Sequence, residues 1–356
     1  MNCQPAGMEE RALAGHEAPP FWYQNPGLMS LALRPLGAVY GAAARYRMDK
    51  ANAATINAPV VCIGNLTAGG TGKTPTAIAL AKLAMQAKLK PGFVSRGYGG
   101  IHVNAHQVDI TSDTASAVGD EPLLLARVAP TIVGQNRAAS AGKLVDGGCD
   151  FIIMDDGFQS RSLHYDYALV TLDAQRGIGN GQVIPAGPLR APLIDQMRHA
   201  TAILRIGEGD AGDVVIRAAA RAAKPFMHAK LMPENPEALS GKQVLAFTGI
   251  GNPQKFFDTL STIDCWVGAS RSFGDHHAYT EAEAQQLLDK ASAENLELVT
   301  TEKDAVRLTH KEGPLAALRQ KAHVLPVSLQ FGLKTDGSGI ISTTIEQYEQ
   351  RRLAAK

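Results

Sequence analysis

From residue 59 onward, short apolar segments alternate with longer segments rich in alanine and leucine. The short segments carry β-branched and aromatic residues, and they predict strands at residues 60–64, 92–95, 131–134, 151–155, 168–173 and 202–206. Residues 75–89 are apolar on most sides, as expected of a helix that covers a sheet. This alternation is typical of βαβ units, so it predicts a mostly parallel α/β sheet with helices on both faces.

A second α/β set follows the proline-containing segment 224–242, which we interpret as a linker. Its predicted strands lie at residues 244–250, 296–301 and 323–329. A chain of 356 residues can hold two domains of roughly 100–200 residues each. The expected division is an N-terminal extension with a hydrophobic segment at residues 1–50, a core at 51–225, and a smaller C-terminal α/β domain at 226–356.

Near the start of the chain, residues 28–44 form an apolar run that three aromatic residues precede and two arginines follow. Arg34 and Pro35 interrupt this run, and a spanning helix needs roughly 20 apolar residues, so we predict no transmembrane helix. The pattern favours a helix that packs on the protein body, and it leaves open an interfacial segment at the lipid headgroups. Residues 1–18 are polar and lack the apolar centre of a secretory signal, so we interpret them as an extension.

Net charge and cysteine spacing give no support for a nucleic-acid ligand, a zinc site or a disulfide framework. Lysine and arginine number 35 and the acidic residues 34, so nothing in the net charge of +1 favours nucleic acid. Any anionic ligand must therefore be recognised locally. The four cysteines, at positions 3, 62, 149 and 265, have neither zinc-ligand nor disulfide-framework spacing. We expect a reducing, cytosolic setting and no obligate protein partner.

The most informative stretch is "GNLTAGGTGKTP", residues 64–75, between a predicted strand and a predicted helix. Backbone N–H groups of such a turn point at phosphate oxygens, and glycines let the chain approach closely. Lys73 is expected to reach the β- and γ-phosphates, while the Thr74 hydroxyl binds Mg²⁺. Pro75 is tolerated because the first helical turn has no N–H partners to lose.

Thr67 stands where the usual G-x-x-x-x-G-K-[ST] pattern has glycine. The stretch is therefore open to three interpretations: a connecting turn, a nucleotide switch, or a kinase with a modified loop. The compact "GGTGKT" resembles the variant loop of the signal-recognition and MinD-like class of P-loop proteins. That class often has lysine before the double glycine, and Ala68 at this position disfavours a switch.

A phosphate loop needs an acidic partner at the end of a neighbouring strand to organise Mg²⁺. The segment "FIIMDDGFQ" supplies it, with Asp155 and Asp156 directly after four apolar residues. Adjacent side chains at a strand end diverge, so we expect different roles for the two aspartates. Asp155 is the candidate metal ligand, and Asp156 is expected to face the second substrate.

Further candidate residues lie in loops that a plain ATPase does not need. In "VGDEPLLLA", Asp120 is either an acidic helix cap or a functional carboxylate. In "SFGDHHAYT", His276 lies beside carboxylates, which suits general-base work, and the alternative is a surface helix start. Arg96 and Tyr98 in "SRGYGG" and Arg190 in "GNGQVIPAGPLRAP" also lie on glycine-rich loops.

Together these motifs resemble the tetraacyldisaccharide 4′-kinase family. In the family's order, the chain contains "FWYQNP", "IGNLTAGGTGKTP", "SRGYGG", "GDEP", "DDGFQ", "PAGPLR", "FGDHHAY" and "TTEKDAVR". The resemblance implies a P-loop kinase that transfers the γ-phosphoryl group of ATP to the 4′-hydroxyl of an acylated glucosamine disaccharide 1-phosphate, giving lipid IVA. It further implies Mg²⁺ and a peripheral position on the cytoplasmic face of the bacterial inner membrane, with residues 28–44 partly interfacial.

The resemblance also assigns roles to residues. The implied catalytic residues are Asp120, His276 and Lys73, with the first two forming a dyad. The implied nucleotide-binding residues are Gly69, Gly70, Thr71, Gly72, Lys73 and Thr74, and the implied metal ligands are Thr74 and Asp155. The implied substrate-binding residues are Arg96, Tyr98, Arg137, Asp156, Gln159 and Arg190.

Two positions depart from the family pattern. Ser160 stands where the family usually has histidine, and Ala191 stands where it usually has glutamate. If that glutamate contributes to the metal shell, water or another carboxylate must replace it here. Two rival functions remain, namely a MinD-like P-loop ATPase switch and a kinase for a soluble small molecule.

Overall fold

The computed structural model describes residues 18–50, 53–97, 100, 104–308 and 312–354. The described chain forms two compact units. The smaller unit comprises Pro233–Ser328 together with Thr114–Ser116, and the larger unit holds the other described residues. Each unit contains its own sheet.

Within the described residues, the larger sheet has nine strands in the order β13-β8-β7-β6-β1-β5-β2-β4-β3. Strand β1 lies at its centre and pairs in parallel with β5 and β6, whereas the two-residue β3 is antiparallel to β4. The strands are β1 Val60–Asn65, β2 Pro91–Ser95, β3 His106–Gln107, β4 Thr131–Val133, β5 Phe151–Asp155, β6 Tyr167–Asp173, β7 Ala202–Ile206, β8 Phe226–Pro233 and β13 Val327–Phe331.

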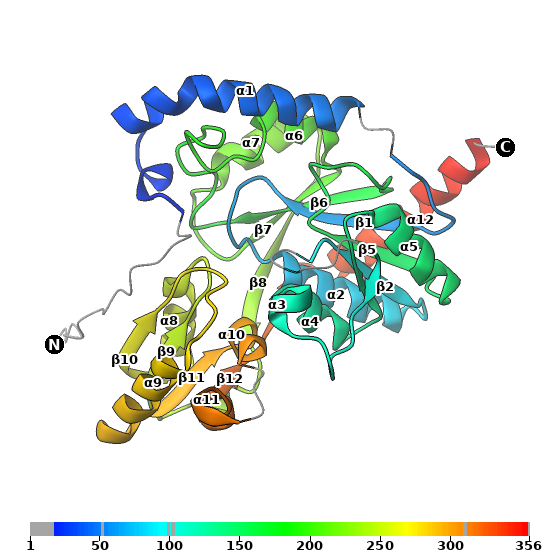
Figure 1. Ribbon diagram of the computed structural model, residues 1–356. Coiled ribbons are helices and arrows are strands. Elements are labelled where there is room, and N and C mark those ends of the chain that lie inside the picture. Colours follow the sequence, from blue (N-terminus) through cyan, green and yellow to red (C-terminus); the bar gives the residue numbers. More distant parts are fainter. Residues whose placement is uncertain (1–17, 51–52, 98–99, 101–103, 309–311, 355–356) are drawn as a thin grey trace. The chain divides into compact units, whose positions relative to one another are not determined.

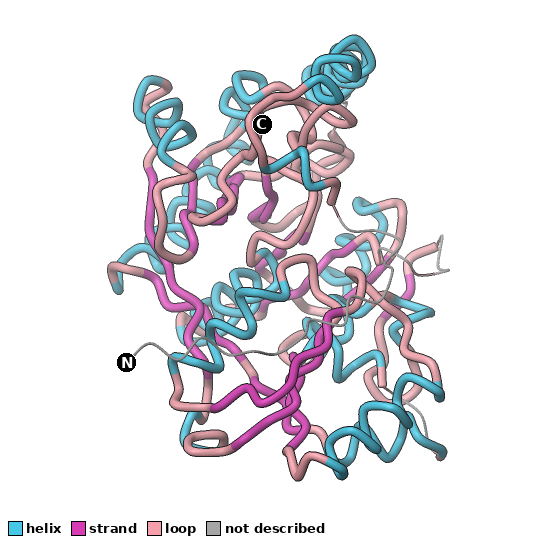
Figure 2. Tube along the Cα trace, turned by 90° about the vertical axis from the view of Figure 1, so that its left-hand side faces the viewer, coloured by secondary structure: helices cyan, strands magenta, loops and turns pink. Residues whose placement is uncertain are grey.

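Helices cover both faces of this sheet (Figures 1 and 2). Because side chains alternate along a strand, Val60 and Cys62 of β1 pack in one core cluster and Val61 and Ile63 in the other. The first cluster includes residues of α1, α5, α6 and α7, and the second includes residues of α2, α4 and α12. The helices are η1 Pro20–Tyr23, α1 Leu28–Lys50, α2 Lys73–Gln86, α3 Ala115–Val118, α4 Asp120–Ala126, α5 Arg137–Asp146, α6 Leu193–His199, α7 Asp213–Arg221 and α12 Lys334–Ala354.

Helix α1 has an unusual distribution of side chains. Its buried positions recur at helical spacing and are mostly small, namely Ser30, Gly37, Gly41, Ala44 and Met48. Large apolar side chains face outward instead: Leu28 is 87% exposed, Leu36 60% and Val39 71%. Among the described helices, none is long and apolar enough to cross a membrane.

The smaller unit is built on a second parallel sheet, whose four strands follow the order β10-β9-β11-β12 within the described residues. Separate core clusters lie around Phe247 and around Phe256. Its elements are η2 Pro236–Ala238, β9 Gln243–Thr248, α8 Pro253–Thr262, β10 Trp266–Ser272, α9 Glu281–Ala293, β11 Glu297–Thr301, α10 Glu302–Arg307, α11 Gly313–Lys321 and β12 His323–Leu325.

The six strands and the helix predicted for the core are confirmed, with ends shifted by a few residues. The predicted linker 224–242 is wrong in its first half, because residues 226–233 form β8 beside β7. Only every other residue of β8 tends toward burial, so its mixed composition hid the strand. The predicted strand 323–329 is divided at Pro326, and Pro35 lies inside α1 rather than ending it.

The compact units also differ from the division expected at residue 226. Strands β8 and β13 belong to the large sheet, and α12 packs against α2 of the larger unit. The chain therefore leaves the large sheet after β8, builds the smaller unit, and returns through β13. Strands β3 and β10 were not predicted; β3 has only two residues, and no residue of β10 is fully buried.

Gly64 provides a test of packing under the central strand. A Cβ added there would lie 2.4 Å from the Cβ of Phe158, which is fully buried. We expect Gly64→Ala to lower the free energy of unfolding by about 1–3 kcal/mol, because a packed side chain and backbone must shift. Urea denaturation would measure the change.

Gly142 in α5 is the matched control, since nothing lies within 4 Å of its added Cβ. Gly142→Ala should leave stability unchanged or raise it by about 0.5–1 kcal/mol through helix propensity. Equal effects at both positions would contradict the packing argument.

Candidate active site

The phosphate loop connects the end of β1 to the start of α2. Gly72, the residue before α2, has φ 81°, and a Cβ there would come within 2.8 Å of Ile206. Both the backbone conformation and the available space therefore require glycine. Within the described residues, no side chain caps the start of α2, so the N–H groups of Lys73 and Thr74 at its first turn suit an anionic ligand.

Thr67, the departure from the usual loop pattern, has a defined structural role. It forms an antiparallel bridge with Leu189, and Ala68 N donates to Pro188 O at 2.8 Å. The first half of the loop is thus paired with the segment that carries "PAGPLR". Glycine is unnecessary at position 67 because the backbone there is extended and paired, not tightly turned.

The side chain of Asn65 shapes the same loop. Its Nδ2 donates to Thr67 O at 2.7 Å and to Gly69 O at 3.1 Å. Thr71 Oγ1 lies 2.7 Å from Thr171 Oγ1, and Thr171 donates to Gly64 O at 3.1 Å. These buried contacts hold the loop in its shape from the sheet side.

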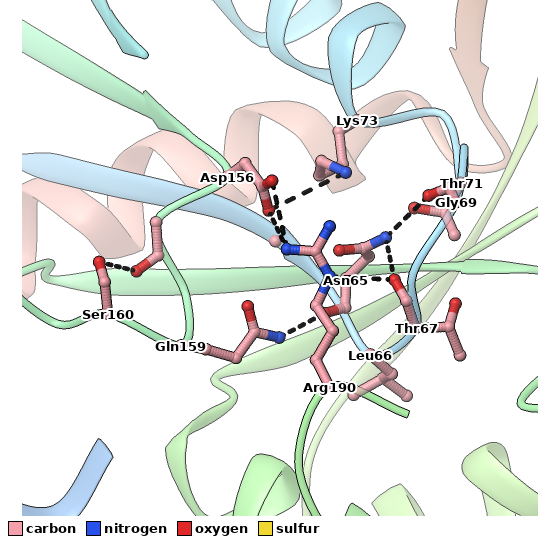
Figure 3. A network of polar contacts seen from close by, with 12 residues as sticks. Asn65, Leu66, Thr67, Gly69, Thr71, Lys73, Asp156, Gln159, Ser160 and Arg190 are labelled. Atoms are coloured by element: carbon pink, nitrogen blue, oxygen red, sulfur yellow. Dashed lines mark hydrogen bonds and ion pairs between the residues drawn. The ribbon is translucent and has the colours of Figure 1, made fainter. Parts of the chain in front are cut away.

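Asp156 belongs to the polar network drawn in Figure 3, where its carboxylate faces Lys73 and Arg190. Arg190 Nη1 donates to both of its oxygens, at 3.1 and 3.3 Å, and Lys73 Nζ lies 4.0 Å from Oδ1. Arg137 Nη2 donates to the Asp156 backbone oxygen at 2.7 Å. Three cations from three separate elements therefore converge on the residue directly after β5.

Electrostatics at this position favour the ionised carboxylate. Burial by itself would raise the pKa of Asp156, but Lys73, Arg190 and Arg137 outweigh it and lower the pKa to about 2. Burial lowers the pKa of Arg137 below its usual range; Asp156 opposes this shift, and the positive charge of Arg96 adds to it. Lys73, Arg190, Arg137 and Asp156 together carry more positive than negative charge, which suits a phosphate ligand.

Arg137 also contacts one of the two positions that depart from the family pattern. Its Nη1 donates to Ser160 Oγ at 2.8 Å, and Ser160 Oγ donates to Gly157 O. The serine therefore anchors this arginine beside Asp156. Ala191, the other departure, is fully buried, and its carbonyl accepts a hydrogen bond from Gln196 Nε2 at 2.7 Å.

The other expected ligands of this region lie around the network. Asp155 ends β5, next to Ile63 of β1, and is fully buried, while Thr74 is 2% exposed in the first turn of α2. Gln159 Nε2 donates to Asn65 O at 2.7 Å and to Gln196 Oε1 at 3.0 Å, so its amide nitrogen is engaged within the protein. Arg96 is exposed after β2, and Tyr98 lies outside the described residues.

Asp120 is not the N-cap of α4. Gly119 occupies the cap, with φ 92°, and Asp120 is the first helical residue. Its side chain is buried at 4% exposure, and Oδ1 accepts a hydrogen bond from Glu121 N at 2.9 Å. The capping interpretation is therefore wrong, and Asp120 is a buried carboxylate in the first turn of α4.

The two adjacent histidines of the smaller unit have different environments. The His277 ring stacks on Phe273 at 4.8 Å, and its Nε2 lies 3.0 Å from Glu283 Oε2. His276 has φ 59° and a side chain that is 35% exposed. His277 is thus packed and paired, whereas His276 is more exposed and lies 3.9 Å from Asp275, so it is the better candidate for chemistry. Because Asp120 and His276 belong to different units, their dyad stays a prediction.

Sequence inspection missed Asn65, Thr171 and Gln196, which support the loop without being part of the glycine motif. An asparagine directly after a strand is a recognisable turn signal. Thr171 and Gln196 act through contacts across more than 100 residues of chain, and the sequence contains no local signal for such contacts.

A central parallel strand, a glycine-rich turn, an uncapped helix start with Lys73, and carboxylates on the neighbouring strand define a P-loop α/β protein. The family model "Tetraacyldisaccharide-1-P 4'-kinase" matches residues 29–345. The chain belongs to this family.

Individual relatives agree with this assignment. The tetraacyldisaccharide 4'-kinase of Chelativorans sp. (strain BNC1) is 50% identical over 341 residues, covering 96% of this chain and 99% of the relative. That of Mesorhizobium japonicum is 50% identical over 338 residues, covering 95% and 98%. A crystal structure of LpxK from Aquifex aeolicus, described as an "apo" form in complex with ATP, has a TM-score of 0.68 at 23% identity, covering 89% and 99%, which supports the fold.

The lowered pKa of Asp156 predicts a pH dependence of stability. Its ionised form stabilises the fold fully above the ordinary carboxyl pKa near ~3.9, and this contribution is lost as pH falls through about 2. The difference in unfolding free energy between wild type and Asp156→Asn should therefore be constant above about pH 5 and shrink in more acid solution. Urea titrations between pH 3 and 7 would follow the onset.

Asp258→Asn, at an exposed position of α8, is the control and should leave stability close to wild type throughout. A difference between wild type and Asp156→Asn that stays constant down to pH 3 would contradict the assignment of the charges.

Proposed function

We propose that this protein is an ATP-dependent kinase that phosphorylates the 4′-hydroxyl of tetraacyldisaccharide 1-phosphate, forming lipid IVA in lipid A biosynthesis. The observation that carries the proposal is the convergence of Lys73, Arg190 and Arg137 on Asp156 beside the phosphate loop. Family membership supplies the identity of the acceptor.

ATP is the proposed donor. Amides of the phosphate loop and of the first turn of α2 would bind its phosphate oxygens, and Lys73 is positioned to move from Asp156 to the β- and γ-phosphates. The ATP complex of the Aquifex aeolicus protein supports this choice. Arg190 and Arg137 would stabilise negative charge on the phosphoryl group during transfer.

Mg²⁺ fits the residues present. The Thr74 hydroxyl and the Asp155 carboxylate are oxygen donors of the kind Mg²⁺ prefers, and both lie at the phosphate end of the paired strands β1 and β5. In the described part of the chain, no cluster of three His, Cys, Asp or Glu side chains could hold a metal. Phosphate oxygens and water would complete the coordination, and the bound ion would offset charge on the phosphates.

The acceptor hydroxyl needs a group that orients it and takes its proton. We assign this role to Asp120 and His276 acting together, with His276 as the base. The buried position of Asp120 and the exposed ring of His276 support the assignment. Asp156, Gln159, Arg96 and Tyr98 are the proposed contacts to the disaccharide and its phosphate.

The lipid substrate has to be taken from a membrane surface, and α1 is suited to that task. Gly37 and Gly41 allow α1 to approach Val183 and Pro192 closely, while Leu36 and Val39 face outward. A helix that hides small residues and exposes large apolar ones is suited to the headgroup region. We therefore propose peripheral attachment to the cytoplasmic face of the inner membrane through α1.

Purified protein with Mg-ATP and tetraacyldisaccharide 1-phosphate should form the bisphosphate, detected by mass spectrometry. Lys73→Ala should lower the rate at least about 100-fold, because the cation that follows the migrating phosphoryl group is lost. Lys82→Ala, an exposed lysine of the same helix, is the control and should remain near wild type. Absence of product from folded wild-type protein would refute the proposal.

Attachment through α1 can be tested separately. The double variant Leu36→Glu with Val39→Glu should abolish sedimentation with anionic phospholipid vesicles. Transfer of a charged side chain to the boundary between headgroups and acyl chains is energetically unfavourable. Leu333→Glu, at a side chain that is 65% exposed outside α1, is the control. Vesicle binding by the double variant equal to wild type would show that α1 is not the attachment site.

A further inference from the structure

Asp304, from the motif "TTEKDAVR", is a fully buried carboxylate in the smaller unit. It lies near the carboxyl ends of β9 and β11 and receives five hydrogen bonds. Thr248 Oγ1 and Thr301 Oγ1 donate to Oδ2 at 2.7 and 2.6 Å. Gly249 N, Tyr279 OH and Arg307 Nη1 donate to Oδ1 at 2.9, 2.8 and 2.9 Å. A carboxylate with this many donors is held rigidly in one orientation.

Gly249 connects this carboxylate to the candidate base. Its N–H donates to Asp304, and its carbonyl accepts from Arg307 Nη1 at 2.7 Å and from His276 N at 3.2 Å. A Cβ at Gly249 would meet Gly274 O at 2.9 Å, so the backbone of the histidine turn passes directly over it. The backbone of one glycine residue therefore contacts both the ion pair and the backbone of His276.

Tyr279 fixes the other side of the same turn. Its phenol donates to Asp304, and its ring packs edge-on against Phe273 and His277 at 5.0 and 5.3 Å. Burial, and then the negative charge of Asp304, raise the pKa of Tyr279 well above its usual value, so the phenol stays a donor. The turn that carries His276 is thus held by Asp304 at both ends.

A backbone conformation at φ 59° is uncommon for residues other than glycine and needs support from its surroundings. We propose that the buried Asp304–Arg307 pair positions His276, by fixing Gly249 and Tyr279 on either side of its turn. This inference rests on the proposed function of His276 as the base. Asp304 and Arg307 are positioning residues, and they act within the smaller unit through contacts of 2.7–3.2 Å.

A double-mutant cycle tests the inference. Asp304→Asn keeps the size of the side chain but loses the charge and one acceptor oxygen, so His276 should be misplaced while ATP binding is unaffected. We expect kcat to fall about 10- to 100-fold with the KM for ATP within about twofold of wild type. In a His276→Ala background the same substitution should cost less than about twofold, because no base is left to position.

The activities of these variants distinguish a failure of the positioning role from a failure of the proposed role of His276. Wild-type activity of His276→Ala would refute the role of His276 and, with it, this inference. Reduced activity of His276→Ala together with an equal effect of Asp304→Asn in both backgrounds would refute only the positioning role. An unchanged kcat in folded Asp304→Asn would also refute it.

Arg307 provides a second route if Asp304→Asn does not fold. Arg307→Met removes the donor to Gly249 O and Asp304, whereas Arg307→Lys keeps a charge and a donor and should restore part of kcat. No difference between the two variants would contradict the inference. Asp166→Asn in the larger unit is the matched control, since it breaks a buried ion pair with Arg351 at 2.8 Å. It should lower the melting temperature without lowering kcat.

Discussion

The attraction between one carboxylate and three cations organises the phosphate site. Asp156 follows β5, Lys73 begins α2, Arg137 begins α5, and Arg190 comes from the segment before α6. Burial opposes the charge of Asp156, yet its pKa is about 2, so the cations decide the balance. Three cations so close together would repel one another without an anion between them. Asp156 supplies that anion in the absence of nucleotide, and phosphate groups can share the role when ATP binds.

The rest of the larger unit serves to bring these residues together. Parallel pairing of β1 with β5 puts the phosphate loop and the two aspartates at the same edge of the sheet, where ligands of open α/β sheets bind. The segment before α6 then pairs with the loop through Thr67 and delivers Arg190. The same segment contacts α1 through Val183, so α1 and the phosphate loop share one support.

Much of this arrangement could be predicted from local sequence. The six core strands predicted from the sequence are short apolar runs. The phosphate loop and the aspartate pair were also recognisable, because the residues that define each motif are adjacent in the sequence: Gly72, Lys73 and Thr74 in one, Asp155 and Asp156 in the other. Strand β8 could not be predicted in the same way, because it takes its partners from β7 and β13, the second of which lies about a hundred residues further on. The roles of Thr67 and Ser160 also depend on distant partners, Leu189 and Arg137. The sequence did not indicate that the large apolar residues of α1 are exposed, because this depends on which small residues the helix buries against the rest of the protein.

In the proposed reaction, the phosphoryl group goes to a lipid hydroxyl and not to water. The most direct measurement follows γ-labelled ATP in one reaction with vesicles that carry tetraacyldisaccharide 1-phosphate. Label in the lipid and label in inorganic phosphate are counted together. We expect nearly all transferred label in the lipid, and we expect ATP turnover to stop when the lipid acceptor is omitted. ATP hydrolysis at the same rate with and without the acceptor, and no labelled lipid, would contradict the proposed reaction.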